Sequence, residues 1–359
     1  MTEARDFCVR QFKAGMPVLC LVVPLALAAL VADQYGSIGV VRSVTEALIK
    51  IVIVVGLYIF IGNSGVISLG STAFMAIAAY ATTWQTCCSM MKPMVMSGLP
   101  EFLKQTTVPF APAAGIAIGL AGLAAFLSGF VLMRLSGLAA SIGTLALLFI
   151  VNVAYSNWDS VTMGASSVVG IPTYVTVWLA LAAAVLSIVV AYAFQTSRAG
   201  LALRATREDE VAAQAIGVSI YRMRLLAFTI SGAVLGLAGV LHAHFLGVLS
   251  IDMFFMQLTF LSISMLVVGG MGSLAGAVVG VVFLSIVIEV FRTLERGILI
   301  GDTKASLPAG TQELVLAAIM LCVLIWKRDG IMSWKEITWP LMRRAPASDA
   351  GRGAEAPSR

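Results

Sequence analysis

The residues best suited to chemistry lie in one polar segment, 196–224, with apolar sequence on both sides. It holds an acidic triplet, a run of small residues and five arginines: Arg198, Arg204, Arg207, Arg222 and Arg224. A charge at the centre of a bilayer costs about 2.5–3.5 kcal/mol. The segment therefore lies outside the hydrocarbon, and its charges suit recognition of another molecule. We interpret it as the contact by which a membrane protein meets a soluble partner.

A short helix is predicted inside this segment. Acidic side chains favour a helix N-terminus, alanines favour a helix with little bulk, and Gly217 provides a stop. Such a helix suits insertion into a groove of another protein. The residues assigned to this contact are Glu208, Asp209, Glu210, Ala212, Ala213 and Gly217. Two alternatives remain: a solvated connection held by local charge pairs, or binding of anionic lipid, which the acidic triplet would weaken.

Other catalytic patterns are missing from the sequence. No Walker motif G-x-x-x-x-G-K-[ST] occurs, so we do not expect ATP hydrolysis by this chain. The five cysteines have no metal-ligand or disulfide spacing. His242 and His244 lie at the outer end of an apolar run, and we expect both at the surface. The sequence thus predicts a non-catalytic chain without a cofactor, a metal or a catalytic residue.

The composition is that of a membrane protein. Hydrophobic residues make up 60% of the chain and charged residues 11%, with a mean hydropathy of +0.98, whereas soluble domains have about 25% charged residues. Apolar runs near the roughly 20-residue spanning length recur along the chain. We therefore predict an all-α polytopic membrane protein with about ten transmembrane helices. Its net charge of +5 reflects membrane orientation and not nucleic-acid binding.

Ten apolar runs are the predicted spans. They lie at about 16–32, 45–61, a third that follows the Gly/Ser-rich stretch 62–74 and ends near 83, then 110–133, 138–156, 173–194, 225–246, 254–270, 273–291 and 308–326. The first run could be a cleaved signal peptide. Its length, its two prolines and the lack of a clean A-x-A site favour a retained span.

The predicted organisation has three parts. Residues 1–15 form a cytoplasmic N-terminus, 16–326 the membrane domain with its loop 196–224, and 327–359 a cytoplasmic tail that is disordered from about 345. If the N-terminus is cytoplasmic and the spans alternate in direction, about twice as many basic residues lie near the spans on the cytoplasmic side as on the opposite side. Both termini and the loop are therefore expected in the cytoplasm.

Two Gly-rich stretches, 62–71 and 269–276, interrupt the apolar runs. Transporters often place unwound or re-entrant backbone beside the substrate path. The alternative is close helix packing through small residues. The polar residues that could line a path are Asn63, Ser68, Ser71, Thr72, Ser141, Thr144 and Asn152.

The run RAGLALRATREDEVAAQAIGVSIYRMRLLAFTISGAVLGLAGVL, followed by SMLVVGGMGSLAGAVVG, resembles the permease subunits of branched-chain amino acid ABC importers, and within that family the LivM branch. GNSGVISLGSTAF, LSGLAASIGTLAL and GIP follow the family's order and spacing. In that family the central loop couples to an ATPase through an EAA---G pattern. Ala212, Ala213 and Gly217 match this pattern, while Val211 stands at the glutamate position and Glu210 precedes it.

The resemblance implies an inner-membrane permease subunit that forms part of a translocation path for branched-chain amino acids. Its partners would be a second, LivH-like permease subunit, two cytoplasmic ATP-binding subunits that use the ATP, a periplasmic substrate-binding protein and the lipid membrane. Three polar groups common in the family are absent here: a histidine where Ser71 stands, a glutamate near Leu148, and the polar stretch replaced by 163–168.

These departures leave the cargo open, since related importers carry urea, short amides or aromatic acids. An ion-coupled secondary transporter is a rival function. It would need carboxylates within spans, and only Glu289 and Glu313 qualify, both near predicted span ends.

Overall fold

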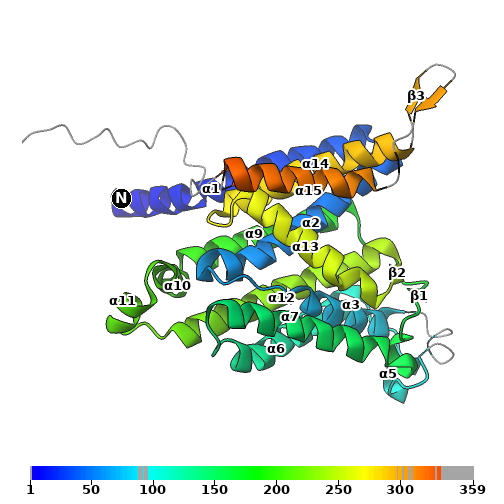
Figure 1. Ribbon diagram of the computed structural model, residues 1–359, viewed down its shortest axis with the longest axis horizontal. Helices are drawn as coiled ribbons and strands as arrows, with labels where there is room; N and C mark the ends of the chain where they lie inside the picture. Colours follow the sequence, from blue (N-terminus) through cyan, green and yellow to red (C-terminus); the bar gives the residue numbers. More distant parts are fainter. Residues whose placement is uncertain are drawn as a thin grey trace, which may run out of the picture.

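The predicted spans are helices in the computed structural model, which describes residues 2–87, 92, 96–296, 298–300, 303–305, 308, 310–327 and 330–332 (Figure 1). In this part, eight helices are long and apolar enough to cross a membrane. They are α1 (Thr2–Tyr35), α2 (Ile38–Ser64), α6 (Phe110–Leu132), α7 (Gly137–Ser156), α9 (Val177–Thr196), α12 (Ile220–Leu246), the 3₁₀ turn η1 (Ile251–Phe254) continuing into α13 (Met256–Gly269), and α14 (Leu274–Arg296). The other two predicted runs are the short helices α3 (Thr72–Thr86) and α15 (Thr311–Trp326), of which α15 is apolar. The all-α class is thus confirmed, with eight helices rather than about ten that meet the spanning length and hydropathy within the described residues.

Helix α2 forms the centre of the bundle. Every residue from 51 to 64 is buried, and a helix that is apolar all round is expected in a core. Helices α9, α12 and α14 pack around it. Against α12 lies α6, whose buried residues repeat every four positions: Ala113, Ala117, Ala121 and Ala125. This stripe of small side chains lets the two helices approach closely, as membrane helices commonly do.

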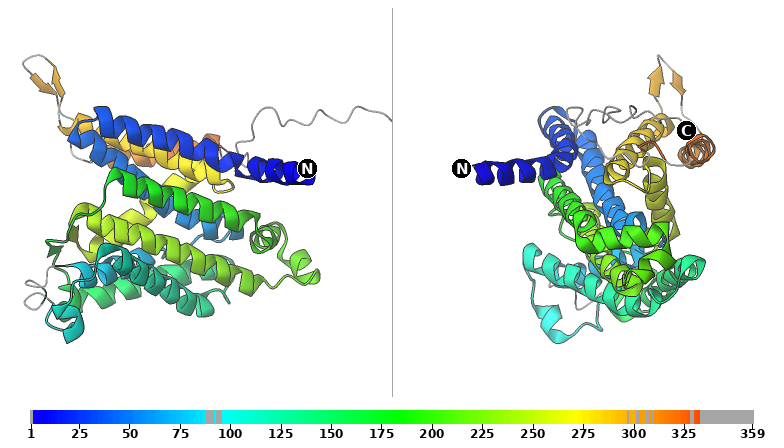
Figure 2. Two further views of the ribbon diagram at one scale, coloured as in Figure 1. Left: turned by 180° about the vertical axis from the view of Figure 1, so that it is seen from behind. Right: turned by 90° about the vertical axis from the view of Figure 1, so that its left-hand side faces the viewer.

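The two ends of the bundle differ (Figures 1 and 2). At one end lie the start of α1, the end of α15, and two short helices of the polar segment, α10 (Arg198–Glu208) and α11 (Glu210–Ala215). At the other end lie α5 (Glu101–Gln105) and two small antiparallel ribbons. One pairs β1 (Val168–Val169) with β2 (Val248–Leu249), and the other pairs β3 (Ile298–Ile300) with β4 (Thr303–Ala305). We call the first end the α11 end.

The first Gly-rich stretch is an unwound segment. Helix α2 stops at Ser64, and the chain has no regular structure until α3 begins at Thr72. With 27 residues α2 is about 40 Å long, but α3 with 15 residues reaches only about 22 Å, less than the roughly 30 Å hydrocarbon core. The helical run is therefore broken at residues 65–71, as the broken-helix alternative predicts.

The second Gly-rich stretch is a tight helix connection. Residues 270–273 join α13 to α14, and Ser273 Oγ accepts the Gly276 N–H at 2.8 Å. The two helices touch through glycine: a Cβ at Gly269 would lie 2.0 Å from the Gly276 carbonyl oxygen. Here the structure shows close packing through small residues, as the second alternative predicts.

The predicted surface position of the two histidines is also wrong. His244 is fully buried, and its Nδ1 lies 2.9 Å from the Pro172 carbonyl oxygen and its Nε2 3.4 Å from Thr86 Oγ1. His242 is partly buried and packs against the Phe254 ring. The boundary predicted at residue 15 lies within helix α1, whose apolar span begins at Met16. The tail from residue 333 lies outside the described residues.

Candidate functional site

The polar segment folds into two short helices with ordinary capping. Ser197 caps α10 by accepting the Gly200 N–H at 3.1 Å. Asp209 then caps α11, because its Oδ1 accepts the N–H groups of Val211 at 2.8 Å and Ala212 at 3.0 Å. These contacts satisfy backbone donors that a helix N-terminus leaves free. The predicted short helix is thus present as α11, while Glu208 is the last residue of α10.

Gly217 ends α11 as the sequence predicts. Its φ is +87°, a conformation that glycine adopts without strain. Its N–H donates to the Gln214 carbonyl at 2.9 Å, and the Val218 N–H donates to the Ala213 carbonyl at 3.0 Å. This pair of bonds is the Schellman arrangement. A Cβ at Gly217 would meet no atom within 4 Å, so the turn projects into open space.

Helix α11 presents apolar side chains at the α11 end. Val211 and Ile216 are each 78% exposed, and Ala212 is exposed as well. Ala213 instead faces inward and is 3% exposed, and Glu210 forms an ion pair with Arg224. Exposed apolar groups within a charged segment are typical of a protein contact. The outward face of α11 is therefore a surface suited to a soluble protein.

Arg204 ties α10 to the membrane helices. Its Nε donates to Asn63 Oδ1 at 2.8 Å, at the end of α2. Its Nη2 donates to the Tyr58 hydroxyl at 2.7 Å and to Gln195 Oε1, on α9, at 3.1 Å. The Tyr58 hydroxyl also donates to Gln195 Oε1 at 2.8 Å, which closes a network of four side chains. Hydrogen bonds to a charged guanidinium in a buried setting are strong and fix geometry.

Arg207 makes a second tie one helical turn later. Its Nη1 donates to the Gly62 carbonyl at 2.8 Å, and its side chain lies against Gly65, where a Cβ would come within 3.0 Å of Arg207 Cγ. Burial lowers the pKa of the Arg207 guanidinium, but arginine stays protonated in proteins. Both arginines thus attach α10 to the point where α2 stops and the unwound segment 65–71 begins.

Several residues predicted for the path gather around this unwound segment. Ser71 Oγ donates to Ser68 Oγ at 2.7 Å, and both side chains are buried. The Leu69 N–H donates to Thr144 Oγ1, on α7, at 3.1 Å. The backbones touch here, since a Cβ at Gly70 would lie 1.7 Å from the Thr144 carbonyl oxygen. The segment is therefore fixed against α7 by side-chain and backbone contacts.

The remaining predicted path residues are less closely grouped. The Thr72 and Thr259 hydroxyls lie 2.6 Å apart and join α3 to α13. Ser141 offers its carbonyl to the Thr144 hydroxyl. Asn152 lies two turns further along α7, and its Nδ2 is buried without a hydrogen-bond partner in the described part of the chain. Asn63 stands apart from the group, bound to Arg204.

The sequence interpretation missed Tyr58, Gln195 and Thr259, although each is a polar residue in an otherwise apolar run. That isolation was the available signal. Among the residues that the structure describes, no group of three His, Cys, Asp or Glu side chains could hold a metal ion.

Comparison with known proteins agrees with these features. The family described as branched-chain amino acid transport system / permease component matches residues 39–324. The chain is 27% identical over 330 residues to the high-affinity branched-chain amino acid transport system permease protein LivM of Escherichia coli (strain K12), and 28% identical to the protein of that name of Salmonella typhimurium (strain LT2). Each alignment covers 82% of this chain and 70% of the relative.

No solved structure matches the chain. The family match spans most of the sequence, from the second residue of α2 to near the end of α15. This chain is a polytopic membrane protein that belongs to the family of branched-chain amino acid transport permease components.

Proposed function

We propose that this chain is the inner-membrane permease subunit of an ABC importer for branched-chain amino acids, and that α10 and α11 transmit the motion of a cytoplasmic ATPase to it. The observation that supports this most is the double attachment of α10 by Arg204 and Arg207 to the end of α2. A partner that moves the exposed face of α11 would move this junction with it.

The proposed mechanism is alternating access. ATP binding would close the two partner ATPases and displace α11, and α10 would carry the displacement to Asn63 and Gly62. The unwound segment 65–71 follows directly and contacts α7 at Thr144. Unwound backbone changes conformation more readily than a continuous helix does, because it has no continuous series of helical hydrogen bonds to break. The path beside Ser68, Ser71 and Thr144 would thereby switch from one side of the membrane to the other.

The assembly that this role requires has other members. A second permease subunit would complete the path, two ATP-binding subunits would hydrolyse ATP, and a periplasmic binding protein would deliver the amino acid. This chain would contribute no catalytic residue. The α11 end and both termini would face the cytoplasm, which agrees with the excess of basic residues predicted on that side.

Gly217→Arg tests the coupling role. The change places a bulky charge at a positive-φ turn with open space around it. We expect the protein to insert in the membrane but to lose its ATPase during purification of the coexpressed complex, with loss of leucine uptake. Gly137→Arg is the matched control, because Gly137 also has a positive φ of +56° and an added Cβ there would meet no atom within 4 Å. Normal ATPase retention and uptake in Gly217→Arg would refute the proposed coupling role.

A further inference from the structure

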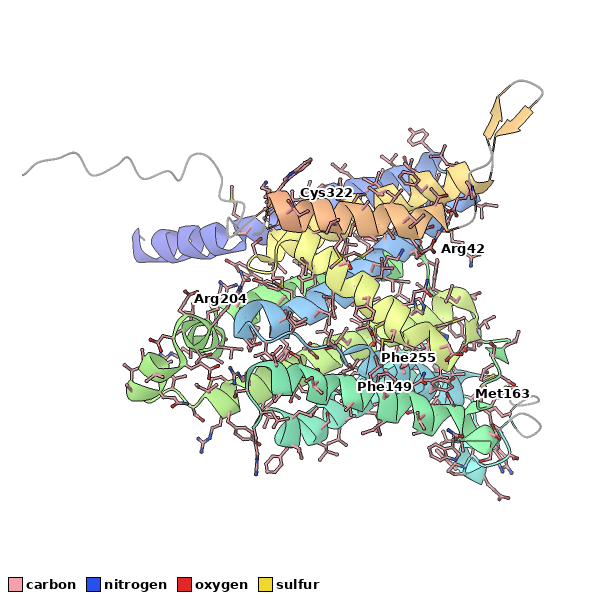
Figure 3. The ribbon with its side chains drawn as sticks, in the orientation of Figure 1. Arg42, Phe149, Met163, Arg204, Phe255 and Cys322 are labelled. Carbon is pink, nitrogen blue, oxygen red and sulfur yellow. The ribbon has the colours of Figure 1, made fainter. Side chains whose placement is uncertain are left out.

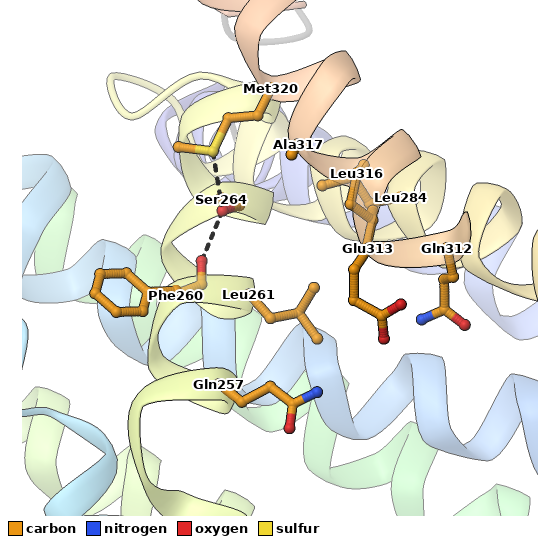
Figure 4. Close-up of a pocket in the computed structure, with 10 residues that line it drawn as sticks. All are labelled: Gln257, Phe260, Leu261, Ser264, Leu284, Gln312, Glu313, Leu316, Ala317 and Met320. Carbon is orange, nitrogen blue, oxygen red and sulfur yellow. Dashed lines mark hydrogen bonds between the residues drawn. The ribbon is translucent and has the colours of Figure 1, made fainter. Parts of the chain in front are cut away.

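A cavity of about 300 Å³ lies between α13, α14 and α15 (Figure 4). It is separate from the unwound segment and from the polar segment described above. The lining includes three polar side chains, Gln257 near the start of α13 and Gln312 and Glu313 at the start of α15. Gln257 and Glu313 are exposed and Gln312 is half-buried, so we call this end of the cavity its opening. In the described part of the chain, none of these three side-chain heads has a hydrogen-bond or ion-pair partner. Figure 4 shows Gln312 and Glu313 side by side on α15 and Gln257 below them on α13.

Away from this end the cavity is lined mainly by apolar side chains. Leu261, Leu284 and Leu316 line its walls. The Ser264 hydroxyl lies 3.2 Å from Met320 Sδ and joins α13 to α15. Gln257 and Ser264 are seven residues apart on a helix, as are Glu313 and Met320, so the Ser264–Met320 contact lies about 10 Å along the helices from the polar opening. The cavity thus combines a polar opening with an aliphatic interior.

The start of α15 is fixed by a contact of its own. The Gln312 N–H donates to Glu295 Oε1, near the end of α14, at 2.9 Å. This bond holds the first turn of α15 against α14 and leaves the Gln312 amide and the Glu313 carboxylate at the opening. Both α13 and α15 begin at the end of the bundle opposite the α11 end (Figure 1). The opening is therefore on the side from which an imported solute would arrive.

We propose that this cavity binds one aliphatic amino acid on its way through the importer, an inference that rests on the proposed function. Glu313 would accept hydrogen bonds from the ammonium group, and the amide N–H groups of Gln257 and Gln312 would donate to the carboxylate. A branched aliphatic side chain would fill the space between the three leucines. The lining includes a carboxylate and no cationic side chain, which favours an amine over the phosphate of a lipid headgroup.

The test measures binding of radiolabelled leucine to the purified permease–ATPase complex in nanodiscs without the periplasmic binding protein. We expect saturable binding that isoamylamine, which keeps the ammonium group, competes for and that 4-methylpentanoate, which lacks it, does not. Glu313→Gln should weaken leucine binding about tenfold or more, because a hydrogen bond between charged groups is lost, and should remove the discrimination against 4-methylpentanoate. Ala317→Phe should abolish binding by filling the cavity. Glu101→Gln, an exposed acid on α5, should bind as the wild type does.

Three results would overturn the proposal: no saturable binding by the wild-type complex, unchanged binding by Glu313→Gln, or a phospholipid that mass spectrometry finds in the wild-type complex and not in Ala317→Phe. If Ala317→Phe does not assemble, Glu313→Gln decides alone. Uptake by the complete importer separates the two proposals. A wild-type complex that neither binds an ATPase nor takes up leucine would refute the proposed function. Normal uptake by Glu313→Gln and Ala317→Phe would instead exclude only this cavity from the path.

Discussion

Arg204 is the residue on which the proposed coupling depends most. One guanidinium joins three helices, because its hydrogen bonds reach α2 through Tyr58 and Asn63 and α9 through Gln195. Asn63 is fully buried. Removing a donor from a buried acceptor costs about 1–3 kcal/mol. The planar fork of arginine also sets the directions of these bonds, which a lysine ammonium cannot reproduce.

Arg204→Lys should therefore separate ATPase binding from transport. The charge remains and α11 is untouched, so the ATPase should still copurify. Because the fixed link to α2 is lost, we expect leucine uptake to fall about tenfold, in keeping with the loss of one or two charged hydrogen bonds. Arg198→Lys is the control, since Arg198 is exposed on the same helix, and it should transport normally. Uptake by Arg204→Lys equal to that of the control would contradict the linkage.

At the scale of elements, the unwound segment 65–71 begins at the end of α2, where Arg204 and Arg207 attach α10. The same segment contacts α7 at Thr144. Its close approach to α7 leaves no room for a side chain at Gly70, where a Cβ would lie 1.7 Å from the Thr144 carbonyl oxygen. The Thr144 carbonyl oxygen is a backbone atom and cannot rotate away as the end of a side chain can. Any residue larger than glycine at position 70 must therefore shift the segment. This makes Gly70 a sensitive probe of whether the segment must stay in its place.

Gly70→Ala should destabilise the protein by about 1–3 kcal/mol, the usual cost of overpacking, and should impair uptake. The measurement is the Tm of the purified complex together with leucine uptake. Gly119→Ala is the control: Gly119 lies in α6 with no atom within 4 Å of an added Cβ, and alanine favours a helix over glycine. A Gly70→Ala protein with the Tm and uptake of this control would show that the contact has no role.

The elements themselves could be predicted from the sequence, because hydropathy and capping are local. All ten predicted runs are helices, and the left-handed Gly217 follows the end of α11, as its small-residue pattern indicates. The contacts between elements could not be predicted. Asn63 binds an arginine 141 positions away, and Thr72 meets a threonine 187 positions away. The histidines were misplaced for the same reason, since the end of α12 is covered by distant segments.

The candidate site was predictable in part. Charge density alone marks 196–224 as a segment outside the hydrocarbon, and the structure places α10 and α11 at one end of the bundle (Figure 3 marks Arg204 there). Composition could not show that Ala213 faces inward while Val211 and Ile216 face outward. A helix of six residues is too short for its hydrophobic periodicity to show which side is buried. Whether the six residues assigned to ATPase contact serve that role stays a prediction.

At the scale of the whole molecule, the two ends of the bundle would have different tasks in transport. The α11 end carries exposed apolar groups on a charged segment, and the opposite end carries the ribbons, α5 and the opening of the cavity beside Glu313. Helices α2 and α12 run the length between them, with 27 residues each. The ATPase would act on the α11 end, and the amino acid would enter at the opposite end. The permease would therefore transmit movement along the membrane normal.

Site-specific cross-linking would show whether α11 contacts an ATPase subunit. A photoreactive phenylalanine analogue would replace Val211, which is 78% exposed on α11, or Phe102, which is 75% exposed on α5 at the opposite end. In cells that express the whole importer, we expect a cross-link from position 211 to an ATP-binding subunit and none from position 102. A cross-link to the ATP-binding subunit from position 102 and not from position 211 would contradict the proposed coupling role.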